Sequence, residues 1–138
     1  MKTCGVDIKA SEAIFALATL DGTAVAHVPL TLKKLALDDD ELALNVRAFA
    51  TQAAAFVAEH GIERLAIKKR SKKGEFAGGP TTFKIEGILQ LLEGCETVLV
   101  SPQTISAQAK KLGMELPASL NKYQHDAFKA ACAVLLKR

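Results

Sequence analysis

The sequence has no tryptophan, one tyrosine and six phenylalanines, so aromatic residues make up 5% of its 138 residues. Platforms that stack the bases of single-stranded nucleic acid depend on aromatic side chains, and no such platform is predicted here. Three cysteines, Cys4, Cys95 and Cys132, are widely spaced and odd in number, which argues against a disulfide framework and a zinc ribbon. No apolar run approaches the roughly 18 residues of a membrane span, and Met1 opens directly into a strand-like segment without a signal peptide. We expect a cytoplasmic protein with no membrane partner.

Composition is that of an ordinary folded chain, with 49% hydrophobic and 24% charged residues. A chain of this length buries a real core, and neither a linker nor a low-complexity tract divides it, so we expect a single domain over residues 1–138. The formal charge of +3 is too small to indicate a nucleic-acid partner unless the positive charge gathers on one surface. Composition therefore bounds the class of protein and leaves its function open.

The order of strand and helix signals along the chain predicts an α/β fold. Alternating apolar segments predict strands over 3–8, 13–20, 23–30, 62–67 and 97–100. Helical spacing and capping residues predict helices from about 42 to Gly61 and over 82–92, 104–112 and 122–136. This order, βββαβαβαα, implies antiparallel pairing in the opening hairpins and parallel pairing of the later strands. We expect a mixed five-stranded sheet with helices on both faces.

Two aspartates are candidate site residues. Asp7 lies near the carboxyl end of the first predicted strand, where ligands of open α/β sheets usually bind. Asp126 lies in the first two turns of the last helix, whose small residues allow close packing on the sheet. Together they predict a two-carboxylate cation site for Mg²⁺ or Mn²⁺. The alternatives stay open: Asp7 accepts hydrogen bonds from the following turn, and Asp126 complements the helix dipole.

A basic segment with a glycine-rich end lies between the fourth strand and the second helix. Exposed N–H groups at a helix start attract anions, and a basic run adds salt-sensitive contacts to a polynucleotide backbone. A solvated loop with a helix cap is the alternative. The predicted phosphate-binding residues are Lys69, Arg70, Lys72, Lys73, Gly78, Gly79 and Thr81.

The element order, the opening segment Gly5-Val6-Asp7-Ile8 with its hairpin, and Asp126-Ala127 on an alanine-rich last helix resemble the RNase H-like superfamily. Its RuvC-type resolvase branch is the most similar. The resemblance covers nearly the whole chain through short motifs. It implies metal-dependent phosphodiester hydrolysis, with Asp7 as the strand-one acid and Asp126 as the last helical acid. The chain also resembles a small bacterial family of RNase H-like proteins of about this length, which contributes no activity to the prediction.

The sequence departs from the resolvase pattern at two of the four acidic positions. Lys68 stands where the pattern has a glutamate after the fourth strand, and Tyr123 stands where it has the other helical acid. An ammonium group cannot ligate Mg²⁺, and a neutral phenol ligates a hard cation poorly. Glu12, Glu75 and Glu86 are the candidate replacements.

Three hypotheses for function follow from these residues. The first is a divalent-metal phosphodiesterase in which Asp7 and Asp126 hold the metal and Lys68 stabilises phosphate charge. The second keeps the fold and the basic surface for binding structured nucleic acid or a partner, without cleavage. The third is a nucleotide or phosphate-metabolite site, or a structural subunit, on the same scaffold. A homodimer is compatible with each hypothesis.

Overall fold

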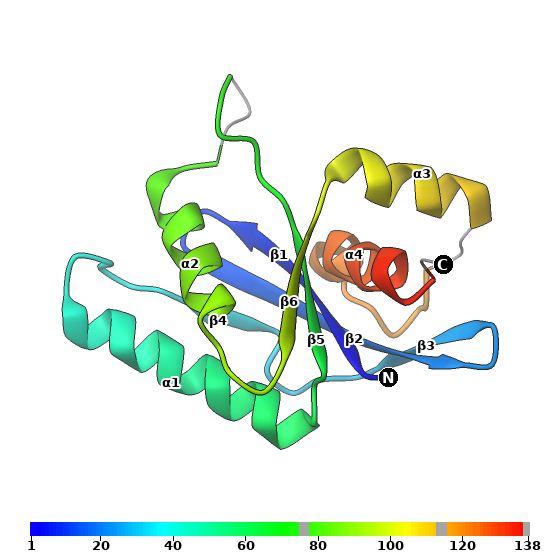
Figure 1. The fold of residues 1–138 in the computed structure, drawn as a ribbon, viewed down its shortest axis with the longest axis horizontal. Helices are drawn as coiled ribbons and strands as arrows, with labels where there is room; N and C mark the ends of the chain where they lie inside the picture. Colours follow the sequence, from blue (N-terminus) through cyan, green and yellow to red (C-terminus); the bar gives the residue numbers. More distant parts are fainter. Residues whose placement is uncertain (75–77, 113–115, 137–138) are drawn as a thin grey trace.

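A mixed β-sheet lies between two layers of helices (Figure 1) in the computed structural model, which describes residues 1–74, 78–112 and 116–136. The strands of these residues are β1 (Thr3–Lys9), β2 (Glu12–Asp21), β3 (Ala24–Val28), β4 (Lys34–Ala36), β5 (Arg64–Lys68) and β6 (Glu96–Val100). The helices are α1 (Ala43–His60), α2 (Pro80–Gln90), α3 (Pro102–Leu112) and α4 (His125–Leu135), with the 3₁₀ turn η1 (Lys122–Gln124) preceding α4. The predicted α/β class, mixed sheet and two helical layers are confirmed.

The pairing of the strands sets which chain segments meet at one edge. The sheet order is β3-β2-β1-β5-β6, with β1 antiparallel to β2 and parallel to β5, and with β5 parallel to β6. Val6 is the register partner of Ile67, so the residues that follow them, Asp7 and Lys68, lie side by side. The carboxyl ends of β1, β5 and β6 therefore share one edge of the sheet.

One strand is additional to the five predicted. β4 has three residues and pairs with the first half of β2, whereas β3 pairs with the second half. The ten residues of β2 are long enough to pair with both short strands along the same side. A three-residue strand has too little alternation to be predicted from its pattern, so the sheet has six strands in the described residues.

The two faces of β1 meet different helical layers. Its even-numbered side chains, Cys4, Val6 and Ile8, belong to the main apolar core with α1 and α2. On the other face a Cβ atom added to Gly5 would lie 1.6 Å from the backbone oxygen of Ala127. The absence of a side chain at Gly5 thus lets the backbone of α4 rest directly on β1. This close contact positions the first turn of α4 at the strand end.

The helix boundaries have local causes. Gly61 ends α1 in the left-handed conformation, with φ of 60°, as a helix-terminating glycine does. The last helix, predicted as one continuous segment, begins with η1, where the Asn121 N–H donates to Gln124 Oε1 at 3.0 Å.

Among the described helices, none has both the length and the hydropathy that crossing a membrane requires.

Candidate nucleic-acid interface

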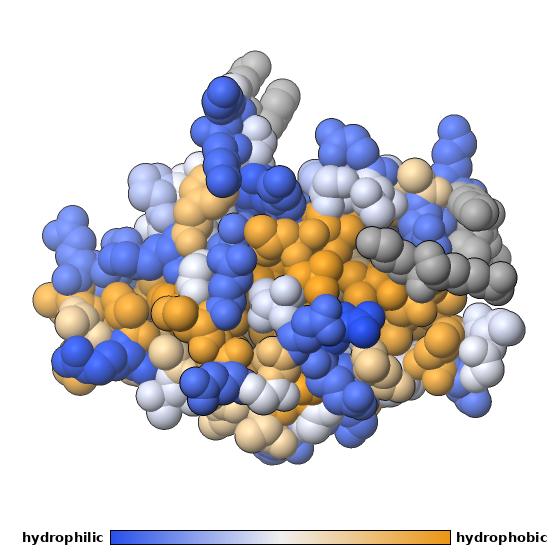
Figure 2. All heavy atoms as spheres, viewed as in Figure 1, coloured by the Kyte–Doolittle hydropathy of each residue, from blue (hydrophilic) through white to orange (hydrophobic). Residues whose placement is uncertain are grey.

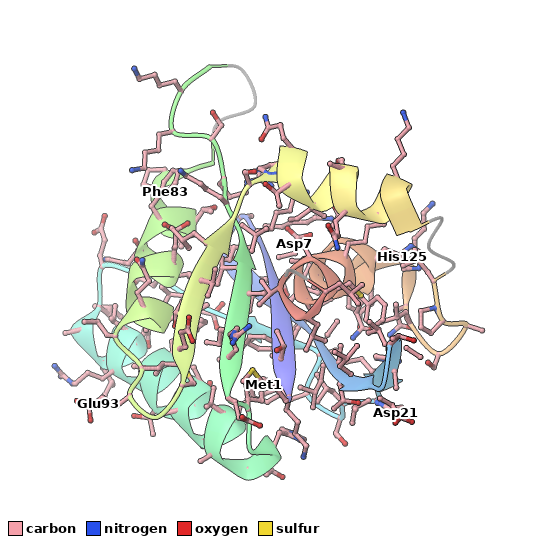
Figure 3. All side chains as sticks on the ribbon, turned by 45° about the vertical axis from the view of Figure 1, so that its right-hand side comes forward. Met1, Asp7, Asp21, Phe83, Glu93 and His125 are labelled. Atoms are coloured by element: carbon pink, nitrogen blue, oxygen red, sulfur yellow. The ribbon has the colours of Figure 1, made fainter. Side chains whose placement is uncertain are left out.

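Asp7 is a fully buried carboxylate at the carboxyl end of β1, facing the layer of α3 and α4 (Figure 3). Neither carboxylate oxygen has a hydrogen-bond partner among the described residues. The predicted alternative, in which Asp7 accepts hydrogen bonds from the following turn, is therefore wrong. The Lys9 ammonium is 3.6 Å from Oδ2 of Asp7 and remains half exposed. A buried carboxylate without hydrogen bonds is costly, so nearby positive charge matters for its stability.

Lys68 and Asp126 meet beside Asp7. The register of β1 and β5 places Lys68 on the same face of the sheet as Asp7, because their neighbours Gly5 and Ala66 are register partners on that face. The Lys68 ammonium donates a hydrogen bond to Asp126 Oδ2 at 2.9 Å. The exposed fractions of the two side chains, 21% and 40%, leave this ion pair open to solvent. Lys68 therefore points into the site.

The two carboxylates have opposite electrostatic balances. Burial raises the pKa of Asp7 above its ordinary value of 3.8, although Lys68, Lys9 and Arg70 act to lower it. Burial also opposes the ionisation of Asp126, but the hydrogen bond from Lys68 and the charges of Lys68 and Lys129 outweigh it, so the pKa of Asp126 is lowered. The positive groups thus outweigh the effect of burial at Asp126 and offset it only in part at Asp7.

The donors present do not fit a two-metal centre. Mg²⁺ and Mn²⁺ need several oxygen ligands, and in the part of the chain that the structure describes no three acidic, histidine or cysteine side chains gather as a metal site. Glu86 lies on α2, on the opposite face of the sheet, and Glu12 is the register partner of Lys9 in the hairpin. Glu75 lies outside the described residues. Tyr123 packs its ring under the Lys34 ammonium, 4.2 Å from the ring centre.

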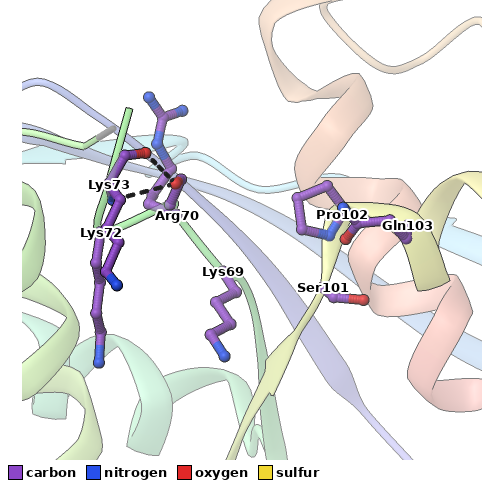
Figure 4. Close-up of a pocket in the computed structure, with 8 residues that line it drawn as sticks. Lys69, Arg70, Lys72, Lys73, Ser101, Pro102 and Gln103 are labelled. Carbon is purple, nitrogen blue, oxygen red and sulfur yellow. Dashed lines mark hydrogen bonds between the residues drawn. The ribbon is translucent and has the colours of Figure 1, made fainter. Parts of the chain in front are cut away.

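A cavity of about 460 Å³ opens between the basic loop and the start of α3 (Figure 4). The basic loop supplies Lys69, Arg70, Ser71, Lys72 and Lys73, and the opposite wall is Ser101, Pro102 and Gln103. Ser101 Oγ accepts a hydrogen bond from the Thr104 N–H at 3.1 Å, which caps α3. The cavity thus combines four cationic side chains with the positive end of a helix. Figure 2 shows hydrophilic side chains gathered where this loop rises above the sheet.

A second cavity, of about 250 Å³, lies between α3 and α4. It contains the Lys68–Asp126 ion pair and Lys129, and its apolar wall includes Ile105 and Ala109. Pro102 lines both cavities, so the two adjoin at the start of α3. We call the two cavities together the basic groove. Its cations outnumber its carboxylates among the described lining residues.

The glycine-rich segment does not take the place predicted for it. The Gly78 N–H donates to the Ser71 carbonyl at 2.9 Å, which closes the basic loop and engages this donor internally. Gly79 precedes α2, which begins with Pro80 as α3 begins with Pro102, so neither helix has an N–H at its first position. The described residues lining the groove include neither Gly78, Gly79 nor Thr81. The basic loop contacts Gly78 before α2, and it lines a cavity with the start of α3.

Two cations of this site were not predicted from the sequence. Lys9 follows Asp7 by two residues, which in a strand places it on the same face. Lys129 follows Asp126 by three residues, which in a helix places it one turn further along the same surface. Both spacings are visible in the sequence. They became informative only once Asp7 and Asp126 were assigned to a strand and a helix.

Solved structures with a similar fold include RuvC and a Holliday junction resolvase. RuvC of Thermus thermophilus is 14% identical to this chain with a TM-score of 0.73, over 96% of this chain and 92% of that chain. The same enzyme in complex with a Holliday junction substrate is 13% identical with a TM-score of 0.69, over 96% and 91% of the chains. The yeast mitochondrial Holliday junction resolvase is 13% identical with a TM-score of 0.59, over 97% and 75%.

At these identities the similarity shows the fold, and the predicted RNase H-like fold of the RuvC type is confirmed. No curated protein matches the chain. A family model described as "Protein of unknown function (DUF3010)" matches residues 1–134. Because that match spans nearly the whole sequence, this protein is a member of the DUF3010 family.

Proposed function

We propose that this protein binds nucleic acid through the phosphate backbone in the basic groove, without metal-dependent cleavage. The observation that carries the proposal is the cavity lined by Lys69, Arg70, Lys72 and Lys73 on one side and by the start of α3 on the other. Phosphate contacts from lysine, arginine and helix N-termini bind and orient nucleic acid without reading its sequence. The fold is shared with RuvC, solved in complex with a Holliday junction, and with a mitochondrial Holliday junction resolvase. Branched DNA is therefore the first ligand to test.

The shape of the groove supports a polynucleotide in preference to an isolated phosphate. Two adjoining cavities extend from the basic loop across the start of α3 to Lys129 on α4. Successive phosphates of one strand lie several ångströms apart, so a row of cations matches a backbone better than a single anion. Lys68 has two ammonium hydrogens beyond the one bonded to Asp126, and these are available to a phosphate oxygen.

A second candidate function is the metal-dependent phosphodiesterase, with Asp7 and Asp126 holding Mg²⁺ or Mn²⁺ and Lys68 stabilising phosphate charge. The observation that favours it is the buried Asp7 carboxylate, which has no hydrogen-bond partner among the described residues. Against it stand the absence of a third carboxylate among those residues and the ammonium already bonded to Asp126. Metal-dependent cleavage of a DNA junction that Asp7→Asn abolishes would establish this second function.

Two further predictions belong to the proposal. Gly78, Gly79 and Thr81 remain predicted as weaker anion contacts, through the start of α2. The protein is also predicted to form a homodimer, in which two grooves would bind two arms of a junction. The molecular mass of the protein in solution tests this prediction.

The experiment compares two arginines. Arg70 lines the groove, whereas Arg47 is exposed on α1, which covers the opposite face of the sheet. Arg70→Glu should weaken binding of a four-way DNA junction by about tenfold or more and lower the salt dependence by about one phosphate contact or more. Arg47→Glu, which makes the same change of charge, should leave the affinity within about twofold.

Two outcomes would contradict the proposal. Equal weakening by the two substitutions would mean that only net charge matters, and the assigned groove would be wrong. Stabilisation of the fold by mononucleotides with no response to duplex or branched DNA would replace the proposal by the nucleotide-site hypothesis.

A further inference from the structure

The carboxylates of Asp7, at the end of β1, and Asp126, on α4, each have a lysine ammonium group nearby. Asp7 has no hydrogen-bond partner among the described residues and is fully buried. Its nearest ion-pair contact is the Lys9 ammonium at 3.6 Å. Asp126, on the helix that rests against Gly5, receives the Lys68 ammonium at 2.9 Å. Two carboxylates brought together by the fold need a cation between them, because like charges in a buried site repel.

Lys68 is placed to meet that need for both carboxylates. It is the last residue of β5 and lies beside Asp7 in the parallel pairing, since Val6 and Ile67 are register partners. Its ammonium reaches Asp126 on the helix that covers this face. Lys68 therefore lies next to Asp7 within the sheet and is hydrogen-bonded to Asp126 on the helix that covers the same face.

We propose that the Lys68 ammonium is a built-in cation that takes over the role of a divalent ion at Asp7 and Asp126, so that the site holds phosphate directly and without metal. This goes beyond the proposed binding of nucleic acid, because it assigns the charge balance of the carboxylate pair. An ammonium has three donor hydrogens. One is bonded to Asp126, and the side chain lines the second cavity together with Lys129, which supplies another donor for a phosphate oxygen.

A divalent ion is disfavoured at this place by the charges around it. It would add two positive charges beside Lys68, Lys9 and Lys129, and only Asp7 and Asp126 would offer carboxylate oxygens among the described residues. The Lys68 ammonium would have to leave Asp126 Oδ2 before this oxygen was free to bind the ion. The ammonium also has an entropic advantage over a free ion, because folding alone places it.

The proposal predicts a gain of metal binding on a single substitution. Lys68→Glu removes the ammonium and places a third carboxylate on β5, between the strand that carries Asp7 and the helix that carries Asp126. Three carboxylates from three adjacent elements can bind Mn²⁺ when water molecules fill its remaining coordination positions. The test is a calorimetric titration of Mn²⁺ into the full chain in the absence of nucleic acid, so its result is independent of the proposed binding function.

We expect no saturable Mn²⁺ binding below about 1 mM for the native sequence, and binding tighter than about 1 mM for Lys68→Glu. Adding Asp7→Asn to Lys68→Glu should remove that binding. Arg47→Glu is the matched control for the change of net charge and should behave as the native sequence does. If Lys68→Glu fails to fold, Lys68→Met serves instead, and Mn²⁺ should raise its Tm more than it raises the Tm of the native protein.

Two results would overturn the built-in cation. One is sub-millimolar Mn²⁺ binding by the native protein that Asp7→Asn abolishes, because the ammonium would then not replace the ion. The other is a folded Lys68→Glu protein that binds Mn²⁺ no better than the Arg47→Glu control.

Discussion

The two faces of the sheet are built on different plans, although β1 contributes to both. On the face covered by α1 and α2, large apolar side chains interlock, and the rings of Phe15 and Phe56 stack with centroids 4.5 Å apart. On the face covered by α3 and α4, the apolar residues form two smaller clusters, in which alanines of β2 and α4 pack together with Phe128 and Cys132. Small residues let a helix backbone approach the sheet closely. The first face provides most of the apolar stabilisation, and the second positions charged groups.

The close approach of α4 explains how the charged cluster forms. Gly5 precedes Asp7 by two residues on the same face of β1, and Ala127 follows Asp126 directly. Contact between Gly5 and the backbone at Ala127 therefore sets the separation of the two carboxylates. The cluster at the strand ends depends on packing further down the same strand. Substitutions on the two faces should thus differ in their effects on the stability of the fold and on DNA affinity. The substitutions with the largest expected effects test this contrast most strongly.

The largest expected effect is that of Gly5→Ala, which should abolish the folded state. Its new methyl group would lie 1.6 Å from the Ala127 oxygen, which is backbone and cannot rotate away. Gly87→Ala is the control, because nothing lies within 4 Å of an added Cβ at that position of α2. The control should stabilise the protein by about 0.5–1 kcal/mol through higher helix propensity. Circular dichroism during chemical denaturation measures both, and a stable Gly5→Ala protein would refute the packing of α4 on β1.

A smaller effect is expected for Phe56→Ala, on the face away from the site. Phe56 is buried and stacks on Phe15, so its truncation should lower the free energy of unfolding by about 3–5 kcal/mol. DNA affinity, measured where the variant is still folded, should not change. A loss of affinity in fully folded protein would show that the two faces are coupled. Phe56→Leu provides a milder substitution if the alanine variant does not fold.

The smallest effect, and the most specific, is the pH dependence of stability caused by Asp7. Its pKa is raised by burial, so the folded protein binds this proton more tightly than the unfolded chain does. Ionisation above about pH 4 therefore costs stability, and the cost grows as the pH rises through the folded-state pKa. The free energy of unfolding of the native protein, relative to that of Asp7→Asn, should fall as the pH rises above the ordinary pKa of the carboxyl group.

The control for this experiment is Asp21→Asn, at an exposed end of β2. A difference between native protein and Asp7→Asn that is constant across the pH range, or that rises with pH, would contradict the buried and incompletely compensated state of Asp7.

The sequence was most informative where local pattern decided the structure. The element order followed from periodicity and capping, and the nearness of Asp7 and Asp126 followed from placing one at a strand end and the other on the last helix. The orientation of Lys68 did not follow, because a shift of one residue in the strand register would reverse it. β4 was missed because three residues carry too little alternation.

The partner of the basic loop was also beyond local pattern. The neighbouring Gly78-Gly79 segment suggested the start of α2, whereas the cavity lies against the start of α3, some thirty residues along the chain from the loop. The parallel order of β5 and β6 brings the two together, because the loop and α3 both follow strands that end at the same edge. Contacts of this kind depend on the sheet topology, which the sequence leaves undetermined between several pairings.

The most direct test of the central claim is the affinity of the native protein for a four-way DNA junction across a series of salt concentrations, in EDTA and in Mg²⁺. We expect the protein to bind the junction in EDTA. The logarithm of the association constant should fall linearly with the logarithm of the salt concentration, by about 0.9 for each of several contacted phosphates. Mg²⁺ should weaken this binding by competing for the phosphates. Binding that requires Mg²⁺, or no binding at low salt in EDTA, would contradict a metal-independent phosphate groove.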